Sequence, residues 1–235
     1  MLANKKFYER IANKNSVYEG GSINIVFLGD SVTHGVFELT EDPYIDYDRF
    51  GSHSMKFHKM LCTLFPWAHF NIINSGVNGD SAQMGLARFE RDVLSYRPDL
   101  VVISFGLNDH ENVDIYLDSL SQMFDRLNQL DIPCVYLTEN MMNTFSADDT
   151  AKKYKEYSEH TCVLQNEGAM DRLFDAGIAL AKSKGITVCD MYHKWKTLEK
   201  CGADITHLLA NRINHPIRDM HDFTAFSMIQ TLFFE

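Results

Sequence analysis

Short apolar runs alternate along the chain with longer amphipathic stretches. Five of these runs, each five to eight residues long, are apolar at successive positions: INIVFLG (23–29), FNIIN (70–74), DLVVISFG (99–106), IPCVYLT (132–138) and GITVCDM (185–191). A run that is apolar on both faces is typical of a strand that is covered on both sides in a parallel sheet. The pattern therefore predicts five strands of one parallel sheet.

Helices are expected between these strands. The candidates lie near 50–65, 82–96, 112–130 and 150–184, and a last one runs from about 217 to the C-terminus. Residues 143–160, the most polar stretch, are expected as a loop that leads into a solvated helix. Because right-handed crossovers place such helices on both faces of a parallel sheet, the predicted fold class is α/β, a three-layer α/β/α sandwich.

Length and composition are those of one globular domain. The 235 residues are 45% hydrophobic and 23% charged, and no repeat, low-complexity tract or Pro/Gly-rich linker divides them. We therefore expect a single domain over residues 1–235. The 32 acidic and 22 basic residues give a formal net charge of −10 without a basic stripe, which argues against nucleic acid and anionic membrane surfaces as partners.

Neither export nor a membrane span is expected. The first 21 residues lack an apolar core and a small-residue cleavage pattern, and nowhere do 18 apolar residues follow one another. The expected location is therefore cytoplasmic. The cysteines are widely spaced and form no CxxC pair, which indicates reduced thiols rather than a disulfide framework or a zinc site. They are Cys62, Cys134, Cys162, Cys189 and Cys201.

Polar residues and glycines follow the predicted strands. Ser31 follows the first strand, Gly76 and Gly79 follow the second, Asn108 follows the third, and His215 lies beyond the fifth. The carboxyl ends of parallel strands share one edge of the sheet, and ligands of such sheets bind at that edge. We therefore expect these residues to meet, although His215 lies 184 positions after Ser31.

These residue types are the ones that acyl transfer needs, namely a nucleophile, a base and donors aimed at the developing oxyanion. Ser31 has the hydroxyl and His215 the imidazole. The backbone N–H groups of Ser31 and Gly79, with the side-chain amide of Asn108, form the expected oxyanion hole. Taken alone, Gly-Asp-Ser after a strand is more often a turn or a helix cap, so this interpretation depends on all four segments together.

Four segments in this order resemble sequence blocks of the GDSL or SGNH hydrolase family of serine esterases and lipases. They are GDS (29–31), GVNGDS (76–81), GLND (106–109) and HP....H (215–221). The resemblance implies that Ser31 is the nucleophile, that Gly79 and Asn108 are oxyanion donors, and that His215 is the base. It also implies the flavodoxin-like SGNH hydrolase fold, with strand order 2-1-3-4-5.

One position departs from the family pattern. The family's last block carries an aspartate three residues before the histidine, and here Arg212 stands in that place. An arginine side chain has only donors, so it cannot accept the imidazole N–H. A main-chain carbonyl, such as that of Arg212, is the expected substitute. Asp204 is the runner-up, and the side-chain oxygens of Asn211 and Asn214 are further candidates.

The expected function is that of a serine esterase. It would form an acyl-enzyme on Ser31 and hydrolyse a carboxylic ester, either a short-chain acyl ester or an acetylated carbohydrate. No cofactor and no metal are implied, the expected partner is a small-molecule ester substrate, and the oligomeric state stays open.

Two alternatives stand beside the esterase. A metal-dependent phosphoesterase is suggested by oxygen and nitrogen ligands on one rim, at Asp30, Asp109, His110, His215 and His221. Sensitivity to chelators distinguishes it from a serine enzyme. A binding module without turnover is suggested by the altered last block, and covalent labelling of Ser31 by a fluorophosphonate distinguishes that case. No role is assigned to His34, His110 or His221 in the esterase.

Overall fold

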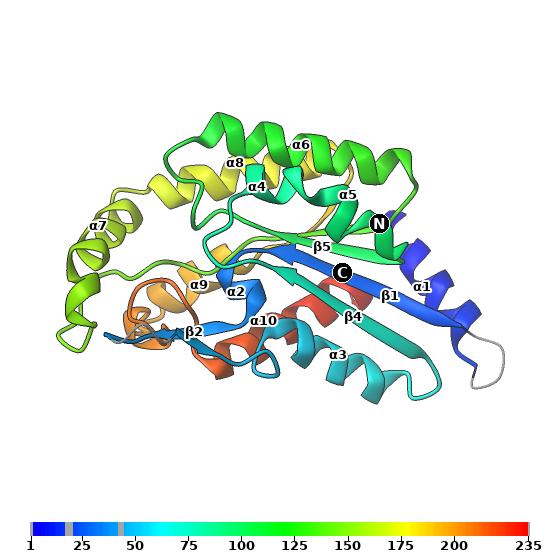
Figure 1. Ribbon diagram of the computed structural model, residues 1–235, viewed down its shortest axis with the longest axis horizontal. Coiled ribbons are helices and arrows are strands. Elements are labelled where there is room, and N and C mark those ends of the chain that lie inside the picture. Colours follow the sequence, from blue (N-terminus) through cyan, green and yellow to red (C-terminus); the bar gives the residue numbers. More distant parts are fainter. Residues whose placement is uncertain (1, 17–20, 42–44, 235) are drawn as a thin grey trace.

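The computed structural model describes residues 2–16, 21–41 and 45–234. Its centre is a sheet of five parallel strands in the order β4-β1-β5-β6-β7 (Figure 1). The strands are β1 (Ser22–Gly29), β4 (His69–Gly76), β5 (Leu100–Ser104), β6 (Cys134–Leu137) and β7 (Thr187–Cys189). Each lies within or overlaps one of the five apolar runs. Counted in the order of those runs the arrangement is 2-1-3-4-5, so the predicted fold class and strand order are confirmed.

Helices cover both faces of this sheet. α3 and α10 pack against each other on one face, and α4, α5, α6 and α8 lie on the other (Figure 1). The helices are α1 (Leu2–Lys14), α2 (Ser31–His34), α3 (His53–Leu64), α4 (Ala82–Ala87), α5 (Phe89–Asp92), α6 (Val113–Gln129), α7 (Lys155–Asn166), α8 (Ala169–Ser183), α9 (Met191–Lys200) and α10 (Arg218–Phe233). The molecule is therefore the three-layer sandwich that the alternating pattern predicts.

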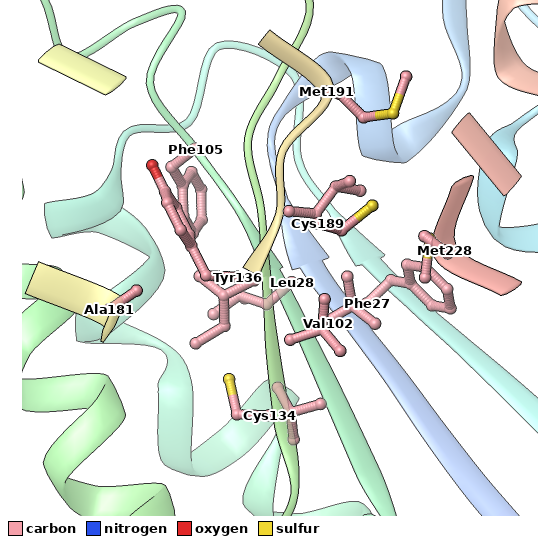
Figure 2. Packing of buried hydrophobic residues seen from close by; sticks show 14 of the residues in the cluster. Phe27, Leu28, Val102, Phe105, Cys134, Tyr136, Ala181, Cys189, Met191 and Met228 are labelled. Atoms are coloured by element: carbon pink, nitrogen blue, oxygen red, sulfur yellow. The ribbon is translucent and has the colours of Figure 1, made fainter. Parts of the chain in front are cut away.

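The core lies between the sheet and the two helical layers. Figure 2 shows Phe27 of β1 beside Met228 of α10, and Tyr136 of β6 beside Phe105 on the other side of the sheet. These four side chains are completely buried. The strands are thus apolar on both faces because both faces are covered.

The cysteines are all free thiols. Cys134 and Cys189 are buried in strands, whereas Cys62 and Cys201 are exposed. The expectation of unpaired thiols is therefore met. None of the helices that the structure describes is long and apolar enough to cross a membrane.

Some helices differ from the predicted ones. The stretch 150–184 is not one helix, because Gly168 has a φ of 73° between α7 and α8, and an α-helix cannot continue through that conformation. The segment of α1 was not predicted as a helix because it is mostly polar. From residue 5 onwards, the buried side chains of α1 form a narrow apolar stripe, with Phe7 and Ile11 one turn apart.

A two-stranded antiparallel hairpin was also not predicted. It consists of β2 (Val36–Leu39), which follows α2 directly, and β3 (Ile45–Tyr47). Residues 42–44, between the two strands in the sequence, lie outside the described residues. The hairpin forms a sheet of its own, separate from the five-stranded sheet, and it packs beside the helix α2 that begins at Ser31.

One side chain ties both strands of this hairpin to the body of the molecule. The guanidinium of Arg218, in the first turn of α10, forms ion pairs with Glu38 at 3.1 Å and with Asp46 and Asp48 at 2.9 Å each. It also lies over the ring of Phe37, 4.2 Å from the ring centroid. A planar guanidinium suits such a site because it can bind carboxylates at its edge and an aromatic ring at its face.

The register of the central strands brings their carboxyl ends to one level. Gly29, the last residue of β1, pairs with Gly76 at the end of β4 and with Ser104 at the end of β5. At Gly76 a Cβ atom would lie 2.3 Å from the backbone nitrogen of His34, so only glycine fits there. The loops that follow these three strands therefore begin side by side.

Candidate active site

The nucleophile candidate begins a short helix at the end of β1. The Asp30 carboxylate caps this helix, because its Oδ1 accepts the N–H of Val32 at 2.9 Å. The helix α2 ends at Gly35, which has a φ of 96°. Ser31 is 4% exposed, so a capped turn holds its hydroxyl at the sheet edge.

Ser31 and His215 meet as predicted. Ser31 Oγ lies 2.9 Å from His215 Nε2, and the imidazole is 3% exposed. This distance is that of a hydrogen bond between a nucleophile and its base. The 184 positions between the two residues are bridged because both lie at the carboxyl edge of the sheet.

The other nitrogen of the imidazole is held by the backbone of the hairpin. His215 Nδ1 lies 3.1 Å from the carbonyl oxygen of Phe37 in β2. A carbonyl can only accept, so the proton of the neutral ring is on Nδ1 and the lone pair on Nε2 faces Ser31. A main-chain carbonyl takes the place of the family's aspartate, as expected. It belongs to Phe37, however, and the prediction of Arg212 was wrong.

The candidates from the last block have other partners. Asp204 binds the backbone and ring of His207 and is half exposed. Asn211 Oδ1 accepts the backbone N–H groups of residues 213–215, and its amide donates to Asn214 Oδ1. Arg212 has a φ of 59° and pairs with Asp149 at 3.0 Å. This turn therefore positions the backbone of His215 and leaves its ring to Phe37.

Burial controls the protonation of His215. Desolvation lowers its pKa to about 4, although the hydrogen bond with the Phe37 carbonyl acts in the opposite direction. The imidazole is thus neutral above about pH 5, which is the state that can accept a proton from Ser31.

Two of the three predicted oxyanion donors point to no acceptor. Among the described residues, no hydrogen bond uses the backbone N–H of Ser31 or of Gly79. Gly79 has a φ of 76°, which a glycine adopts without strain, and a Cβ atom there would meet nothing within 4 Å. The turn after β4 therefore leaves open space beside a backbone N–H group.

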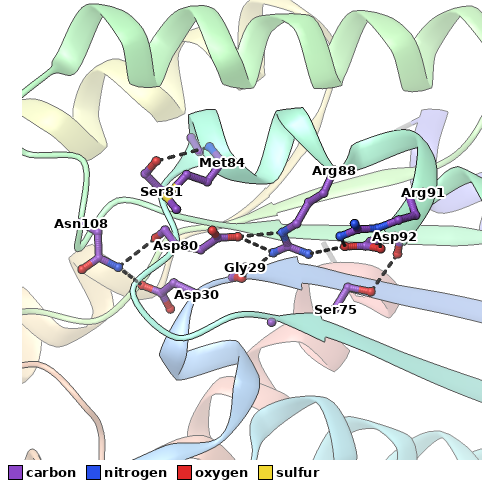
Figure 3. A network of polar contacts seen from close by, with 12 residues as sticks. Gly29, Asp30, Ser75, Asp80, Ser81, Met84, Arg88, Arg91, Asp92 and Asn108 are labelled. Atoms are coloured by element: carbon purple, nitrogen blue, oxygen red, sulfur yellow. Dashed lines mark hydrogen bonds and ion pairs between the residues drawn. The ribbon is translucent and has the colours of Figure 1, made fainter.

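The third predicted donor, Asn108, is already engaged. Its Nδ2 donates to Asp30 Oδ2 at 3.1 Å and to the carbonyl of Asp80 at 2.9 Å (Figure 3). The Asp80 carboxylate in turn pairs with Arg88, which also donates to the carbonyl of Gly29. Asn108 thus joins the loops after β1, β4 and β5, and its contact with an oxyanion stays a prediction.

Sequence reasoning missed Glu139, which lies under this site. Glu139 follows β6, the one strand end for which no polar residue was considered, and it is 3% exposed. Its Oε2 accepts the N–H of Leu107 at 2.9 Å, and its carboxyl group faces that of Asp30. The position of Glu139 two residues after a buried strand was the signal that could have revealed it.

The residues of the metal-site alternative do not converge. Asp109 Oδ1 accepts the N–H of Ala82, and His110 contacts the carbonyl of Leu107. His221 stacks on His53, with ring centroids 5.4 Å apart. Over residues 2–16, 21–41 and 45–234, no group of three or more His, Cys, Asp or Glu side chains could hold a metal ion.

Known proteins resemble this chain in sequence and in fold. An acetylxylan esterase from Geobacillus stearothermophilus is 27% identical over 99 residues, which cover 38% of this chain and 41% of that protein. A two-domain esterase active on acetylated mannans superposes with a TM-score of 0.69 at 20% identity, over 99% of this chain and 53% of that chain. The structure of an acetylxylan esterase from the same Geobacillus species gives a TM-score of 0.67 at 18% identity, over 91% of this chain and 95% of that one.

The chain therefore spans about half the length of the two-domain esterase. The family model described as the GDSL-like Lipase/Acylhydrolase family matches residues 27–222. That range contains the Ser31 turn, Gly79, Asn108 and His215, all at one edge of the sheet. This protein belongs to the GDSL-like lipase/acylhydrolase family.

Proposed function

We propose that this protein is a serine esterase and that acetylated carbohydrates are its substrate class. One observation carries the proposal. Ser31 Oγ lies 2.9 Å from His215 Nε2 while the Phe37 carbonyl accepts from Nδ1. The serine thus contacts the histidine, and the histidine contacts a group that orients it, which is the arrangement that nucleophilic acyl transfer requires.

The reaction has two halves. His215 Nε2 takes the hydroxyl proton as Ser31 Oγ bonds to the ester carbonyl carbon, and the carbonyl oxygen becomes negative beside the N–H groups of Ser31 and Gly79. Collapse of this intermediate releases the alcohol, which takes the proton from His215. Water then attacks the acyl group on Ser31 with His215 again as base, and the acid leaves.

The substrate class is supported by the relatives. The similar proteins include an acetylxylan esterase and an esterase active on acetylated mannans. Both substrates are polysaccharides that carry acetyl esters. A short acyl group on a sugar hydroxyl is therefore the ester that we propose for this chain.

The nucleophile is tested with a control that the chain itself contains. Ser81 belongs to a second Gly-Asp-Ser, at 79–81, but its Oγ caps α4 by accepting the N–H of Met84 (Figure 3). Ser31→Ala should abolish ester hydrolysis and labelling by a fluorophosphonate, whereas Ser81→Ala should keep both. Circular dichroism verifies that both variants fold. Hydrolysis by folded Ser31→Ala would overturn the assignment.

The substrate class is tested separately. Acetate release from acetylated xylo- and manno-oligosaccharides is compared with hydrolysis of p-nitrophenyl esters from acetate to palmitate. We expect kcat/KM to be highest for acetyl esters and to rise further on the acetylated oligosaccharides. A preference for long acyl chains would leave the esterase assignment intact and overturn the carbohydrate substrate.

A further inference from the structure

We propose that Glu139 is a positioning residue that acts as a protonated carboxyl: it donates a hydrogen bond to the Asp30 carboxylate and so holds the Ser31 turn and the Asn108 amide in place. The inference rests on the proposed esterase function, because it assigns a part in that reaction to a side chain beneath the site. Glu139 touches neither the substrate nor the reacting atoms in this scheme.

The partners of Asp30 require it to be an acceptor. Its Oδ1 faces the N–H of Val32 at 2.9 Å, and its Oδ2 faces the Nδ2 of Asn108 at 3.1 Å. Both neighbours are donors, so the ionised carboxylate satisfies them best. A proton shared between Asp30 and Glu139 therefore belongs on Glu139.

The contacts of Glu139 identify the atom that carries this proton. Oε2 accepts the N–H of Leu107, whereas Oε1 is buried and receives no N–H or O–H from the described residues. Two buried carboxyl groups can be hydrogen-bonded to each other only when one of them is protonated. Protonated at Oε1, Glu139 accepts from the loop after β5 and donates to the loop after β1.

The surroundings keep the pair from losing its proton at neutral pH. Burial raises the pKa of Asp30 to about 7 and that of Glu139 well above its usual range. The charged and titratable groups that face the pair are Asp80, Asp109, Tyr116, Tyr136 and Tyr157, and His53 lines the same small cavity as Glu139. The aspartates disfavour a second negative charge, and burial raises the pKa of each of the three tyrosines, so those phenols remain neutral.

Loss of this proton should therefore disturb catalysis. Two adjacent carboxylates repel, and the Asp30 side chain can relieve the repulsion only by moving away from Val32 N–H or from Asn108. Either movement displaces the nucleophile turn or the amide beside it. Misplacement of a reacting group by about 1 Å can lower the rate about 10²-fold.

The decisive variant is Glu139→Gln. Its amide carbonyl can still accept from Leu107 and its NH₂ can still donate to Asp30, but it does not titrate. We expect its kcat near neutral pH to stay within about threefold of the wild type, and the alkaline decline of kcat in the wild type to be absent. Glu139→Leu, which offers no hydrogen bond, should lower kcat about 10²-fold with little change in KM.

Thr138→Val is the matched control, because Thr138 precedes Glu139 and its buried hydroxyl bonds Tyr192 and Asp190 instead. It should lose stability but keep the wild-type pH profile. An unchanged alkaline decline in Glu139→Gln, or wild-type kcat in a folded Glu139→Leu, would overturn the proposal.

Melting temperature provides a readout without activity: it should fall from pH 7 to 9 in the wild type and remain flatter in Glu139→Gln. If the wild type hydrolysed no ester, that result would contradict the proposed function, while the melting curves would still test the proton on Glu139.

Discussion

The orientation of His215 depends on an acceptor that carries no charge. A carboxylate partner would stabilise the imidazolium that forms during attack, whereas the Phe37 carbonyl offers only a dipole. Together with burial, this leaves the imidazole with a pKa of about 4. In the proposed reaction His215 would therefore be a weak base in its resting state, and catalysis would depend on the placement of the ring rather than on a strongly basic histidine.

The tautomer of His215 can be measured directly. We expect the ¹⁵N shifts of the wild-type protein at pH 6 to show a neutral ring that is protonated at Nδ1. Its pKa should lie near 4, because burial disfavours the imidazolium. His207, which is exposed and beside Asp204, serves as the reference. A ring protonated at Nε2, or one that titrates near pH 6.5, would contradict the hydrogen bond with Phe37.

Asn108 gives a second prediction for single residues. Both N–H groups of the Asn108 amide already have acceptors, so the oxyanion role requires one of them to turn towards the substrate. If it does, Asn108→Ala should lower kcat by about 10²–10³ and leave KM nearly unchanged, since the lost donor acts mainly on the developing charge. Steady-state kinetics measure both constants. Asn112→Ala is the control, because Asn112 is exposed and its side chain caps nothing. A defect confined to KM would indicate that Asn108 contacts the bound substrate instead.

At the scale of single residues, the sequence predicted those site residues whose side chains have a recognisable chemistry. Ser31 and His215 could be paired because their chemistry is recognisable and both follow predicted strands. The Phe37 carbonyl could not be identified, because every residue has a carbonyl and no pattern connects position 37 with position 215. Glu139 was hidden for another reason: an acidic residue after a strand is usually a turn residue.

Among the elements, the β2–β3 hairpin has the largest effect on the site. It contributes the carbonyl that orients His215, and Arg218 holds it by ion pairs with both of its strands. A single exposed ion pair contributes little to stability. One guanidinium that contacts three carboxylates and an aromatic ring, however, fixes the position of the hairpin relative to α10. The hydrogen bond from Arg218 lowers the pKa of Asp48, so this anchor persists until the pH is well below neutral.

Removal of this anchor should affect catalysis more than stability. Arg218→Ala frees the hairpin, so the Phe37 carbonyl is held less firmly against His215. We expect kcat to fall about tenfold, with partial recovery in Arg218→Lys, and only a small change in melting temperature. Arg126→Ala removes an exposed ion pair with Glu90, 2.9 Å long, elsewhere on the surface. That control should keep kcat, and equal losses in both variants would count against a role for the hairpin.

Elements with a long, strong apolar pattern were the predictable ones. β1 and β5 are rich in apolar residues on both faces, and α6 has the amphipathic period of a helix between two strands, so each was placed within a few residues. The hairpin lacks such a pattern. Its strands are short, partly exposed and rich in acidic residues, and they are held by Arg218 from a distant part of the chain.

For the whole molecule, two kinds of buried titratable group have opposite effects on how folding stability changes with pH. Carboxyls with raised pKa values bind protons more tightly in the folded state, so their contribution to stability falls as the pH rises; they are Asp30, Asp109 and Glu139. Histidines with lowered pKa values bind protons less tightly in the folded state, so their contribution rises with pH up to about 6.5; they are His53, His215 and His221.

The two sets act in opposite directions between about pH 4 and 6.5, and only the carboxyls still act above that range. Asp30 titrates near pH 7 and Glu139 higher. We therefore expect the melting temperature at constant ionic strength to be highest near pH 6–7 and to decline towards pH 9. Calorimetric scans at one-unit intervals measure this curve. A melting temperature that rose steadily from pH 7 to 9 would show that these carboxyls are not protonated in the folded protein.

The architecture as a whole was the most predictable part. Five apolar runs separated by helical stretches allow few parallel sheets, because crossovers are right-handed and both faces must be covered. The strand order came from the resemblance to the family, since apolar pattern alone does not determine which strand lies next to which. The side-chain contacts between distant loops follow only once that order is known.

The contact between Ser31 and His215 also affects when activity can appear during synthesis and folding. A ribosome has already made all five strands when it reaches residue 215, so an emerging chain can assemble its sheet before its base exists. Closing so long a stretch of chain costs entropy that only native contacts repay. Ester turnover would then be the last property that a newly made molecule acquires, and in refolding it should lag behind the return of helical circular dichroism.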